Sequence, residues 1–474
     1  MNTPINQKNN THTPTVLVGT VDHLPPDVQA MMVAMYSRSY GPITSRLPET
    51  EESMETLRQK LEKYYVNWGH KAVGQLGTTT IFLEGVSQLA AKAIEHNQLY
   101  NGQESSTRYI DFSTQPMHVP DVIGYADHND LADLVRTSQE RLRAIYMKAL
   151  PLVRERLSKE YPRDDALTSM ETWANTIKAR AFDICRSILP AGATTNVAFC
   201  GTFDTINDHF GEILYHPLPE MRAIAERVIS GLQATYPHAT PGVEALKQRF
   251  DYIARASDGD PESTYEYFYP AFQHEYLTDT AVTRWDHSLG GPHARRVLAG
   301  MLSKRKKWDK LPVANYSSKL RFTITGNLDF GSFRDLHRHR NGVCAMPMLN
   351  AYGAIEKWYV EQLPPEIVDE IKEVLADISL ATTDGNMVYL QYAVPMGVQV
   401  PIAYDCDYNQ LAYLIELRTG KTVHQTLRHF MQRVWMDLIH QDDLPQLRES
   451  IYPDLDSENF TLKRGQQTFS GEFK

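Results

Sequence analysis

The sequence predicts an α+β protein built from two tandem domains. Three observations support this prediction: a length of 474 residues, long helical patterns mixed with a few strand patterns, and one strand-then-helix pattern that occurs twice. A single hydrophobic core seldom serves so long a chain, so two domains are expected. The composition, with 42% hydrophobic and 10% aromatic residues, is that of a globular protein. We therefore expect small sheets covered by long helices.

The repeated pattern is a strand followed directly by a helix. In the first half, TTTIFL (78–83) is rich in residues that favour strands, and EGVSQLAAKAIEHN (84–97) has apolar residues at helical spacing. In the second half, LRFTIT (320–325) alternates apolar and polar residues, as a half-buried strand does. DFGSFRDLHRHR (329–340) then reads as a second helix. The same order of elements in both halves points to duplication.

The two copies, compared from Glu95 to Arg338, stand about half of the chain apart. An internal repeat of domain size is therefore expected. Either Asp329 or Ser332 can cap the second helix. Pro and Gly residues gather in 236–265, so we place the domain boundary near residue 240. The expected organisation is a disordered tail at 1–14, a first domain at 15–240 and a second domain at 241–474.

Other patterns complete the expected secondary structure. Apolar residues at 16–18 suggest a strand, and a Pro-marked turn after it leads into a helix. Further helices are expected at 52–70, 132–158, 168–188 and 218–234.

Composition and charge exclude several classes of function. A formal net charge of −10 argues against nucleic-acid and membrane-surface binding, which need a basic surface. The chain contains no run of about 18 apolar residues, and its polar N-terminus lacks the apolar core of a signal peptide. The four cysteines are scattered without a C-x-x-C pair, so neither a metal site nor a disulfide framework is expected. We expect a cytoplasmic protein with reduced thiols.

One short stretch concentrates positive charge. Arg338, His339 and Arg340 follow His337 at the end of the second predicted helix. Such a cluster repels itself unless an anion binds to it, which suggests a phosphate-bearing ligand. The alternative is a solvated helix end that interacts with its own helix dipole.

This cluster, on a helix that follows a strand, resembles the flavin-dependent thymidylate synthases. The signature of that family is R-H-R-x7-S, with an Arg-Tyr pair shortly after the Ser. In the family, the R-H-R residues hold FAD and the loop with the Ser holds dUMP. The resemblance implies that Arg338, His339 and Arg340 bind FAD, since planar guanidinium groups bind phosphates and stack on rings.

The first half resembles the family in its nucleotide-binding parts. NGQESSTRY (101–109) is similar to the dUMP loop, with one extra residue before the Arg, and CRSILP (185–190) is similar to a segment whose Arg also reaches dUMP. Glu95, His96 and Asn97 stand where the R-H-R residues would be. The resemblance implies substrate contacts from Glu104, Ser105, Ser106, Arg108 and Arg186, and a flavin contact from His70.

The second half resembles the family in its other parts. CDYNQLAYLIELRTGKTVHQTLR (406–428) is similar to a late family helix. There Arg418 matches an Arg that activates dUMP as an electrophile, and His424 matches a His near the flavin. Asp407 and Asn409 depart from the Asn and Arg of the family pattern. Met348 stands eight residues past Arg340, so the Ser of the signature is missing from this half.

The losses in the two halves are complementary. We expect one composite site, with the nucleotide loop from the first half and the flavin-binding residues from the second. Family members are tetramers, so the resemblance implies a homodimer of this two-domain chain. Alone, Arg186 could pair with a nearby carboxylate such as Asp183, and His70 or His424 could be packed structural histidines.

The resemblance implies reductive methylation of dUMP to dTMP. The reaction would use FAD, NADPH as the reductant and methylenetetrahydrofolate as the one-carbon donor, with Arg418 and Arg186 in the catalytic roles. One alternative is a diverged flavoenzyme that acts on another pyrimidine nucleotide. A second is a non-catalytic scaffold that binds nucleotide or flavin. A Cys344 nucleophile is a weaker alternative, because the family needs none.

Overall fold

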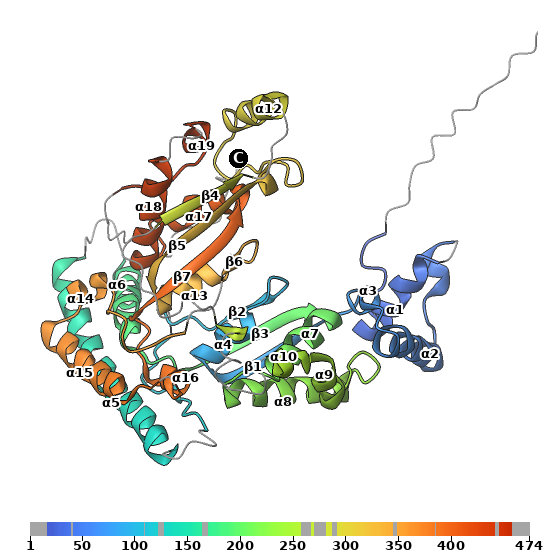
Figure 1. Ribbon diagram of the computed structural model, residues 1–474, viewed down its shortest axis with the longest axis horizontal. Helices are drawn as coiled ribbons and strands as arrows, with labels where there is room; N and C mark the ends of the chain where they lie inside the picture. The colour runs from blue at the N-terminus through green and yellow to red at the C-terminus, as the bar shows by residue number, and fades with distance from the viewer. Residues whose placement is uncertain are drawn as a thin grey trace, which may run out of the picture. The chain divides into compact units, whose positions relative to one another are not determined.

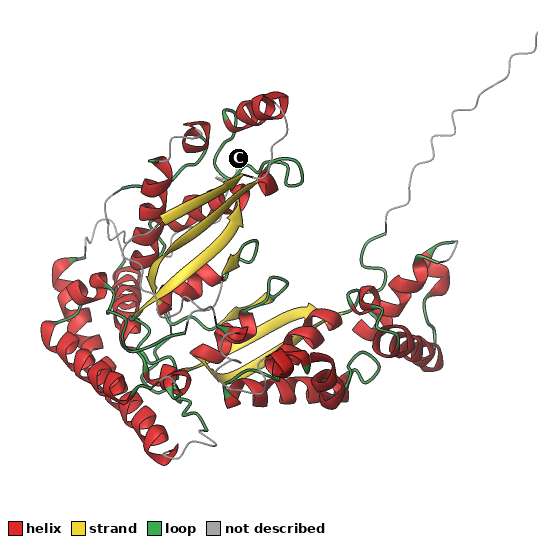
Figure 2. Cartoon of the chain, viewed as in Figure 1, coloured by secondary structure: helices red, strands yellow, loops and turns green. Residues whose placement is uncertain are grey.

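A computed structural model of the chain has helices around two small sheets, the α+β class that the sequence predicts (Figure 1, Figure 2). The predicted tail at 1–14 and Tyr109 of the predicted nucleotide loop lie outside the described residues. The chain divides into two compact units. The predicted domain bounds, 15–240 and 241–474, stay a prediction. The structure describes residues 17–38, 41–108, 110–121, 128–163, 169–256, 267–269, 281–286, 292–344, 348–383, 385–440 and 445–456.

The smaller unit comprises Met1–Thr79, Thr202–Asn207 and Ile229–Gly242. Its N-terminal part is helical, and Thr50 caps the second helix through a reciprocal pair of hydrogen bonds with Ser53. Buried side chains of these helices, among them those of Val28, Leu61 and Tyr65, form a hydrophobic core. The helices are α1 (Pro26–Tyr36), the 3-10 turn η1 (Ile43–Arg46), α2 (Glu51–Leu61), the π-helical turn η2 (Glu62–Asn67) and α3 (Lys71–Gly74).

One local prediction in this unit is wrong. Leu17 and Val18, expected in a strand, belong to no strand and are exposed. An apolar run of three residues cannot form a strand without a partner strand to accept its hydrogen bonds.

The larger unit comprises Thr80–Gly201, Asp208–Val228 and Val243–Lys474. Two sheets supply its frame, with strand orders β1-β3-β2 and β4-β5-β7-β6. The strands of the first sheet are β1 (Thr78–Ser87), β2 (Asn101–Glu104) and β3 (Thr194–Thr202). Those of the second are β4 (Ala281–Asp286), β5 (Leu320–Asp329), β6 (Val343–Cys344) and β7 (Gln399–Asp407).

Helices flank both sheets (Figure 2). The long helices α5 (His128–Glu160) and α15 (Pro365–Ala381) lie side by side, and an ion pair of 2.5 Å joins Arg141 to Asp377 (Figure 1). No helix in the described ranges is both long and apolar enough to cross a membrane. The other helices are α4 (Gln88–Glu95), α6 (Met170–Cys185), η3 (Arg186–Ile188), α7 (Phe203–Ile213), α8 (Pro219–Thr235), α9 (Val243–Phe250), α10 (Tyr252–Ala256), α12 (Pro292–Leu302), η5 (Ser317–Lys319), α13 (Phe330–His337), α14 (Lys357–Gln362), α16 (Met387–Leu390), η6 (Gln391–Ala393), α17 (Tyr408–Arg418), α18 (Gln425–Ile439) and α19 (Pro445–Glu449).

The two sheets are copies of one pattern. β1 and α4 have the same lengths as β5 and α13, so the two pairs of elements align without a gap when Thr78 is set against Leu320. β3 and α7 have the same lengths as β7 and α17, and they align without a gap when Thr194 is set against Gln399. The predicted repeat is thus present in the order and length of the elements.

These element bounds correct the predicted register of the repeat. With Thr78 set against Leu320, Arg338 corresponds to His96 rather than to Glu95. With Thr194 set against Gln399, Arg418 corresponds to Ile213. The sequence alone could not resolve these shifts, because helix ends are defined by backbone hydrogen bonds rather than by residue types.

The two copies cross at a symmetric backbone contact. Ala191 N donates to Val394 O at 2.9 Å, and the reciprocal bond from Met396 N to Leu189 O is also 2.9 Å. When β3 is aligned with β7, Ala191 corresponds to Met396 and Leu189 corresponds to Val394, so each of the two bonds is the counterpart of the other. Such reciprocity is the mark of an isologous, two-fold interface. Within one chain, the copies therefore pack as the two subunits of a dimer would.

Glycine makes this crossing possible. A Cβ on Gly397 would lie 2.6 Å from Cβ of Ser187, and one on its counterpart Gly192 would lie 2.8 Å from the carbonyl oxygen of Tyr392. Both contacts are shorter than van der Waals packing allows. Only a residue without a side chain fits at either position.

Candidate functional site

The candidate site begins at α13, the helix that carries the R-H-R residues. Asp329 caps this helix, because its carboxylate accepts a hydrogen bond of 2.9 Å from Ser332 N, which decides between the two predicted caps. Ser87 caps the equivalent helix α4 in the same way, accepting from Ala90 N at 2.9 Å. Both strands thus lead directly into a capped helix.

Glu104 connects the predicted nucleotide loop to α13 through ion pairs. Its buried carboxylate forms ion pairs with Arg334 and with Arg338, the latter at 3.5 Å, and with Lys92 of α4 at 3.0 Å. Burial raises the pKa of Glu104, but Arg334 and Lys92 outweigh burial and hold the pKa at about 2. Glu104 of the first half is therefore ionised among cations of both halves.

Arg108 closes the other end of the loop. Its Nε and Nη2 donate to both carboxylate oxygens of Asp183, at 2.7 and 3.2 Å, and Nη2 also reaches the carbonyl oxygen of Thr422 at 3.3 Å. The hydroxyl of Ser106 accepts from Arg108 N at 3.3 Å, and Ser105 N bonds to Asn196 O at 3.0 Å. The predicted loop residues are thus held in one place by short contacts.

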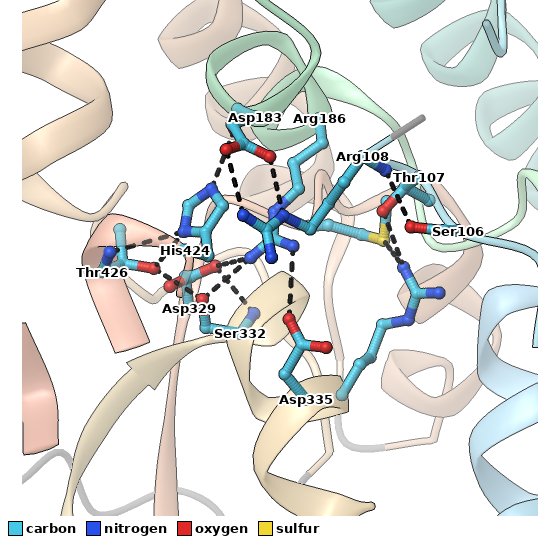
Figure 3. Close-up of polar contacts among 12 residues, drawn as sticks. Ser106, Thr107, Arg108, Asp183, Arg186, Asp329, Ser332, Asp335, His424 and Thr426 are labelled. Atoms are coloured by element: carbon cyan, nitrogen blue, oxygen red, sulfur yellow. Dashed lines mark hydrogen bonds and ion pairs between the residues drawn. The ribbon is translucent and has the colours of Figure 1, made fainter. Parts of the chain in front are cut away.

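Arg186 extends from the first half into the second and is fully buried (Figure 3). It donates to the Ser332 hydroxyl at 2.8 Å and to the Tyr359 hydroxyl at 3.2 Å. Its ion-pair partners are Asp329 at 3.7 Å and Asp335 at 3.6 Å, whereas Asp183, the alternative partner suggested by the sequence, pairs with Arg108. Arg186 thereby ties the start of α13 to the first half.

Arg418 lies next to the R-H-R residues. Its Nε donates to Nε2 of His339 at 2.8 Å, and its Nη2 donates to the carbonyl oxygen of Asp335 at 3.0 Å. Burial lowers the pKa of His339 to about 3, so this imidazole is neutral and accepts the hydrogen bond. Burial also lowers the pKa of Arg418, so an anion near this guanidinium would stabilise its charge.

Arg340 faces the first half. Its guanidinium lies 4.5 Å from the ring centre of Tyr100, and its buried Nη1 has no hydrogen-bond partner among the described residues. Next to it, Nε2 of His337 lies 2.9 Å from Nδ1 of His96, and Nδ1 of His337 is buried with no partner in the same part of the chain. These groups line a small pocket of about 120 Å³ together with His339. The pocket presents the Arg340 cation and histidine rings to a ligand.

The two other predicted histidines, His424 and His70, lie in different environments. His424 is buried, with its Nε2 3.0 Å from Asp183 O and its Nδ1 3.0 Å from the Thr426 hydroxyl, so it belongs to the Arg108 and Arg186 contacts (Figure 3). His70 lies in the smaller unit, where it lines a separate pocket of about 520 Å³ with Arg38 and Lys60.

These contacts define a connected set of charged side chains, called here the composite cluster. It holds two more cations than carboxylates. A surplus of two positive charges matches the charge of a phosphate monoester. The members are Lys92, Arg108, Arg186, Arg334, Arg338, Arg340 and Arg418 with Glu95, Glu104, Asp183, Asp329 and Asp335.

Sequence reasoning missed several members. Lys92 and Arg334 are equivalent residues when α4 is aligned with α13, and each precedes its motif by one helical turn, so the repeat could have revealed them. Asp335 of the cluster, and Tyr359 next to it, carried no recognisable signal, because their contacts to Arg186 join residues far apart in the sequence.

The contacts and burial of Cys344, Asp407 and Asn409 indicate what these residues do. Burial raises the pKa of the Cys344 thiol, so it is protonated and a poor nucleophile. Asp407 caps α17, with Gln410 N bonding to it at 2.9 Å, and Asn409 bonds to both backbone groups of Leu311 at 2.8 Å. The two residues that depart from the family pattern thus hold local structure.

Comparison with known proteins identifies relatives of this chain. Residues 20–238 match the family model described as thymidylate synthase complementing protein. A UPF0159 protein of Chlamydia pneumoniae is 24% identical over 472 residues, which cover 87% of each chain. The UPF0159 protein Ta1429 of Thermoplasma acidophilum is 19% identical over 471 residues, covering 86% of this chain and 91% of its own. Similarity to these relatives therefore runs through both halves. The resemblance is confirmed: over residues 20–238, the chain is similar to the thymidylate synthase complementing proteins, the family of flavin-dependent thymidylate synthases.

Proposed function

We propose that the chain is a flavin-dependent thymidylate synthase with one composite site. The observation that carries the proposal is the contact of Glu104, from the nucleotide loop, with Arg334 and Arg338, from the R-H-R helix. The nucleotide-loop and R-H-R motifs are each complete in one half only, and this contact joins them within one chain. The reaction is reductive methylation of dUMP to dTMP.

The composite cluster suits the nucleotide. Its surplus of two positive charges would neutralise the phosphate of dUMP. Arg108 is the best candidate for the phosphate, because its side chain is not fully buried and lies in the loop that resembles the dUMP loop. Arg418 would bond to the pyrimidine ring and stabilise negative charge that develops there, since its hydrogen-bond partners His339 and the Asp335 carbonyl are both uncharged. Arg186 acts as a positioning residue that holds α13, because its donors are engaged by Ser332 and Tyr359.

The residues next to Arg340 fit a flavin nucleotide. The unpaired Nη1 of Arg340 can donate to phosphate or ring-edge oxygens, and the side chain of Arg338 is one-third exposed. FAD bound there would supply the hydride chemistry of the reaction. The protein residues bind and orient both ligands and exclude water from them.

The overall reaction balances with the proposed co-substrates. Methylenetetrahydrofolate supplies a one-carbon unit, which forms a new bond to C5 of the pyrimidine while the C5 proton leaves. NADPH supplies the two electrons that reduce this unit to a methyl group. The products are dTMP, tetrahydrofolate and NADP⁺, and no cysteine nucleophile takes part.

A second candidate is a diverged flavoenzyme that acts on another pyrimidine nucleotide. Asp407 and Asn409 favour it, because they stand in place of the family's Asn and Arg and serve helix capping and the Leu311 backbone. Release of tritium from C5-labelled dUMP, with NADPH and methylenetetrahydrofolate present, separates the two. Tritium release with dTMP formation supports thymidylate synthesis, and a flavin-bearing protein that releases none supports the diverged enzyme.

We also propose that the chain forms a homodimer, which would bring four family-like halves together as in the family tetramer. Sedimentation equilibrium of the purified chain tests this: twice the chain mass supports the dimer, and a monomer contradicts it.

A further inference from the structure

A pocket of about 220 Å³ lies on α4 and α7 of the first half. Ala93 and His96 line it from the end of α4, and His209 and Ile213 line it from α7. His216 and the segment 267–269 complete the lining. None of the predicted site residues contributes to it. The pocket is therefore distinct from the composite cluster.

The repeat relates this pocket to the composite cluster. Aligning α4 with α13, and α7 with α17, carries three lining residues onto three charged members of that cluster. The pocket thus stands where a second copy of the site would lie. The corresponding pairs are Ala93 with Asp335, His96 with Arg338 and Ile213 with Arg418.

The pocket has lost the charges of its counterpart. Among the described residues that line it there is no Lys or Arg, and the carboxylate of Glu212 borders it. Burial lowers the pKa of His209 to about 4 and that of His216 to about 3, so both imidazoles are neutral. Among the described residues that line the pocket, a phosphate would meet the carboxylate of Glu212 and no cation. This lining disfavours an anionic nucleotide.

The neutral histidines instead offer one acceptor and one donor. Nε2 of His209 lies 2.8 Å from Ile94 O and must carry the hydrogen, so Nδ1 is left as an acceptor. Nδ1 of His216 accepts from Leu218 N at 3.1 Å, so the hydrogen of this ring sits on Nε2, a donor. A ligand with a donor next to an acceptor, such as a lactam, matches this pair.

The walls favour a flat ring. The ring of Phe268 lies 4.8 Å from that of His216, and Tyr269 lies 5.9 Å from it. Aromatic walls of this kind bury planar molecules well. Since an apolar cavity of about 150 Å³ holds benzene, about 220 Å³ accommodates a ring with one or two substituents.

We propose that this pocket, the remnant of the second nucleotide site, binds a small, uncharged, planar lactam heterocycle and rejects anions. The chain would then carry one anion-binding site and one neutral-ligand site at equivalent positions. The inference rests on the repeat and on the lining residues, and it holds whether or not the composite cluster binds flavin.

Fluorine NMR on the full-length protein tests the proposal with two probes of similar size. The neutral probe is 5-fluoro-2-pyridone and the anionic probe is 4-fluorobenzoate. The neutral probe is expected to bind at least about tenfold more tightly than the anionic one. The variant Ala93→Leu fills the pocket and is expected to abolish binding of the neutral probe, whereas Arg418→Ala, in the composite cluster, leaves it unchanged.

A second variant covers the case in which Ala93→Leu does not fold. Phe268→Leu, on a partly exposed segment, removes one aromatic wall and is expected to weaken binding of the neutral probe about tenfold. The proposal is overturned if the anionic probe binds as tightly as the neutral one, or if neither probe binds. It is also overturned if Arg418→Ala removes binding while the pocket variants retain it. None of these results bears on thymidylate synthesis.

Discussion

The carboxylate of Glu104 lies 3.5 Å from Nη2 of Arg338, although 234 residues separate them in the chain. Glu104 belongs to the half that carries the nucleotide loop, and Arg338 to the half that carries the R-H-R motif. Their contact is made inside one chain, in the way that two subunits of a dimer contact each other. Under the proposed function, this contact would let the two halves contribute to one site.

Replacing Glu104 should destabilise the protein strongly. Glu104→Gln leaves Lys92, Arg334 and Arg338 without their shared buried carboxylate, and uncompensated buried charges cost about 3–5 kcal/mol. Urea unfolding measures the free energy of unfolding. Glu155→Gln, which breaks an exposed pair with Lys159, is the matched control and should cost less than about 0.5 kcal/mol. Equal losses for both variants would contradict the role of Glu104.

The crossing of the two copies should be sensitive to a single methyl group. Gly397→Ala places a Cβ 2.6 Å from Cβ of Ser187, and we expect a loss of about 1–3 kcal/mol in the free energy of unfolding. The control is Gly300→Ala on α12, where nothing lies within 4 Å of the new Cβ and helix propensity should rise. If Gly397→Ala left the free energy of unfolding unchanged, the backbones of the two copies would be less closely packed at this contact than the structure shows.

Replacing Arg418 should weaken nucleotide binding and leave flavin binding unchanged. Arg418→Ala removes a charged donor from the proposed pyrimidine site, so the Kd for dUMP should rise about 10- to 100-fold while flavin content stays unchanged. Calorimetric titration with dUMP measures the change. Lys421→Ala, an exposed neighbour paired with Asp456, is the control and should bind dUMP normally. Unchanged dUMP affinity in Arg418→Ala would contradict its assignment.

Stability should fall as the pH falls below about 6.5. Burial lowers the pKa values of His209, His216 and His339 to about 4, 3 and 3, so the unfolded chain binds more protons than the folded one between pH 6.5 and pH 4. Each of the three should contribute a loss of about 1 kcal/mol at pH 5.5 relative to pH 7.5. Thermal unfolding across this range measures it. A Tm that rises or stays constant toward pH 5.5 would show that these imidazoles are not buried and neutral.

Much of the fold follows from local patterns. The alternation in 320–325 and the helical spacing in 84–97 predict β5 and most of α4, although Val86 lies in β1 rather than in the helix. The R-H-R motif and the nucleotide loop were recognisable by residue type. The contacts that join them were not, because no spacing in the sequence relates Glu104 to Arg334 or Arg186 to Tyr359. The pocket on α4 and α7 was also hidden, since its lining comes from three distant segments.

The proposed function requires that one chain builds one site for flavin and pyrimidine nucleotide together. The visible absorbance spectrum of the purified protein during titration with dUMP tests it directly. A composite site predicts a yellow protein with one flavin per chain, whose spectrum changes saturably as dUMP binds beside the flavin. A colourless protein, or a flavin spectrum that dUMP leaves unchanged at every concentration, would contradict it.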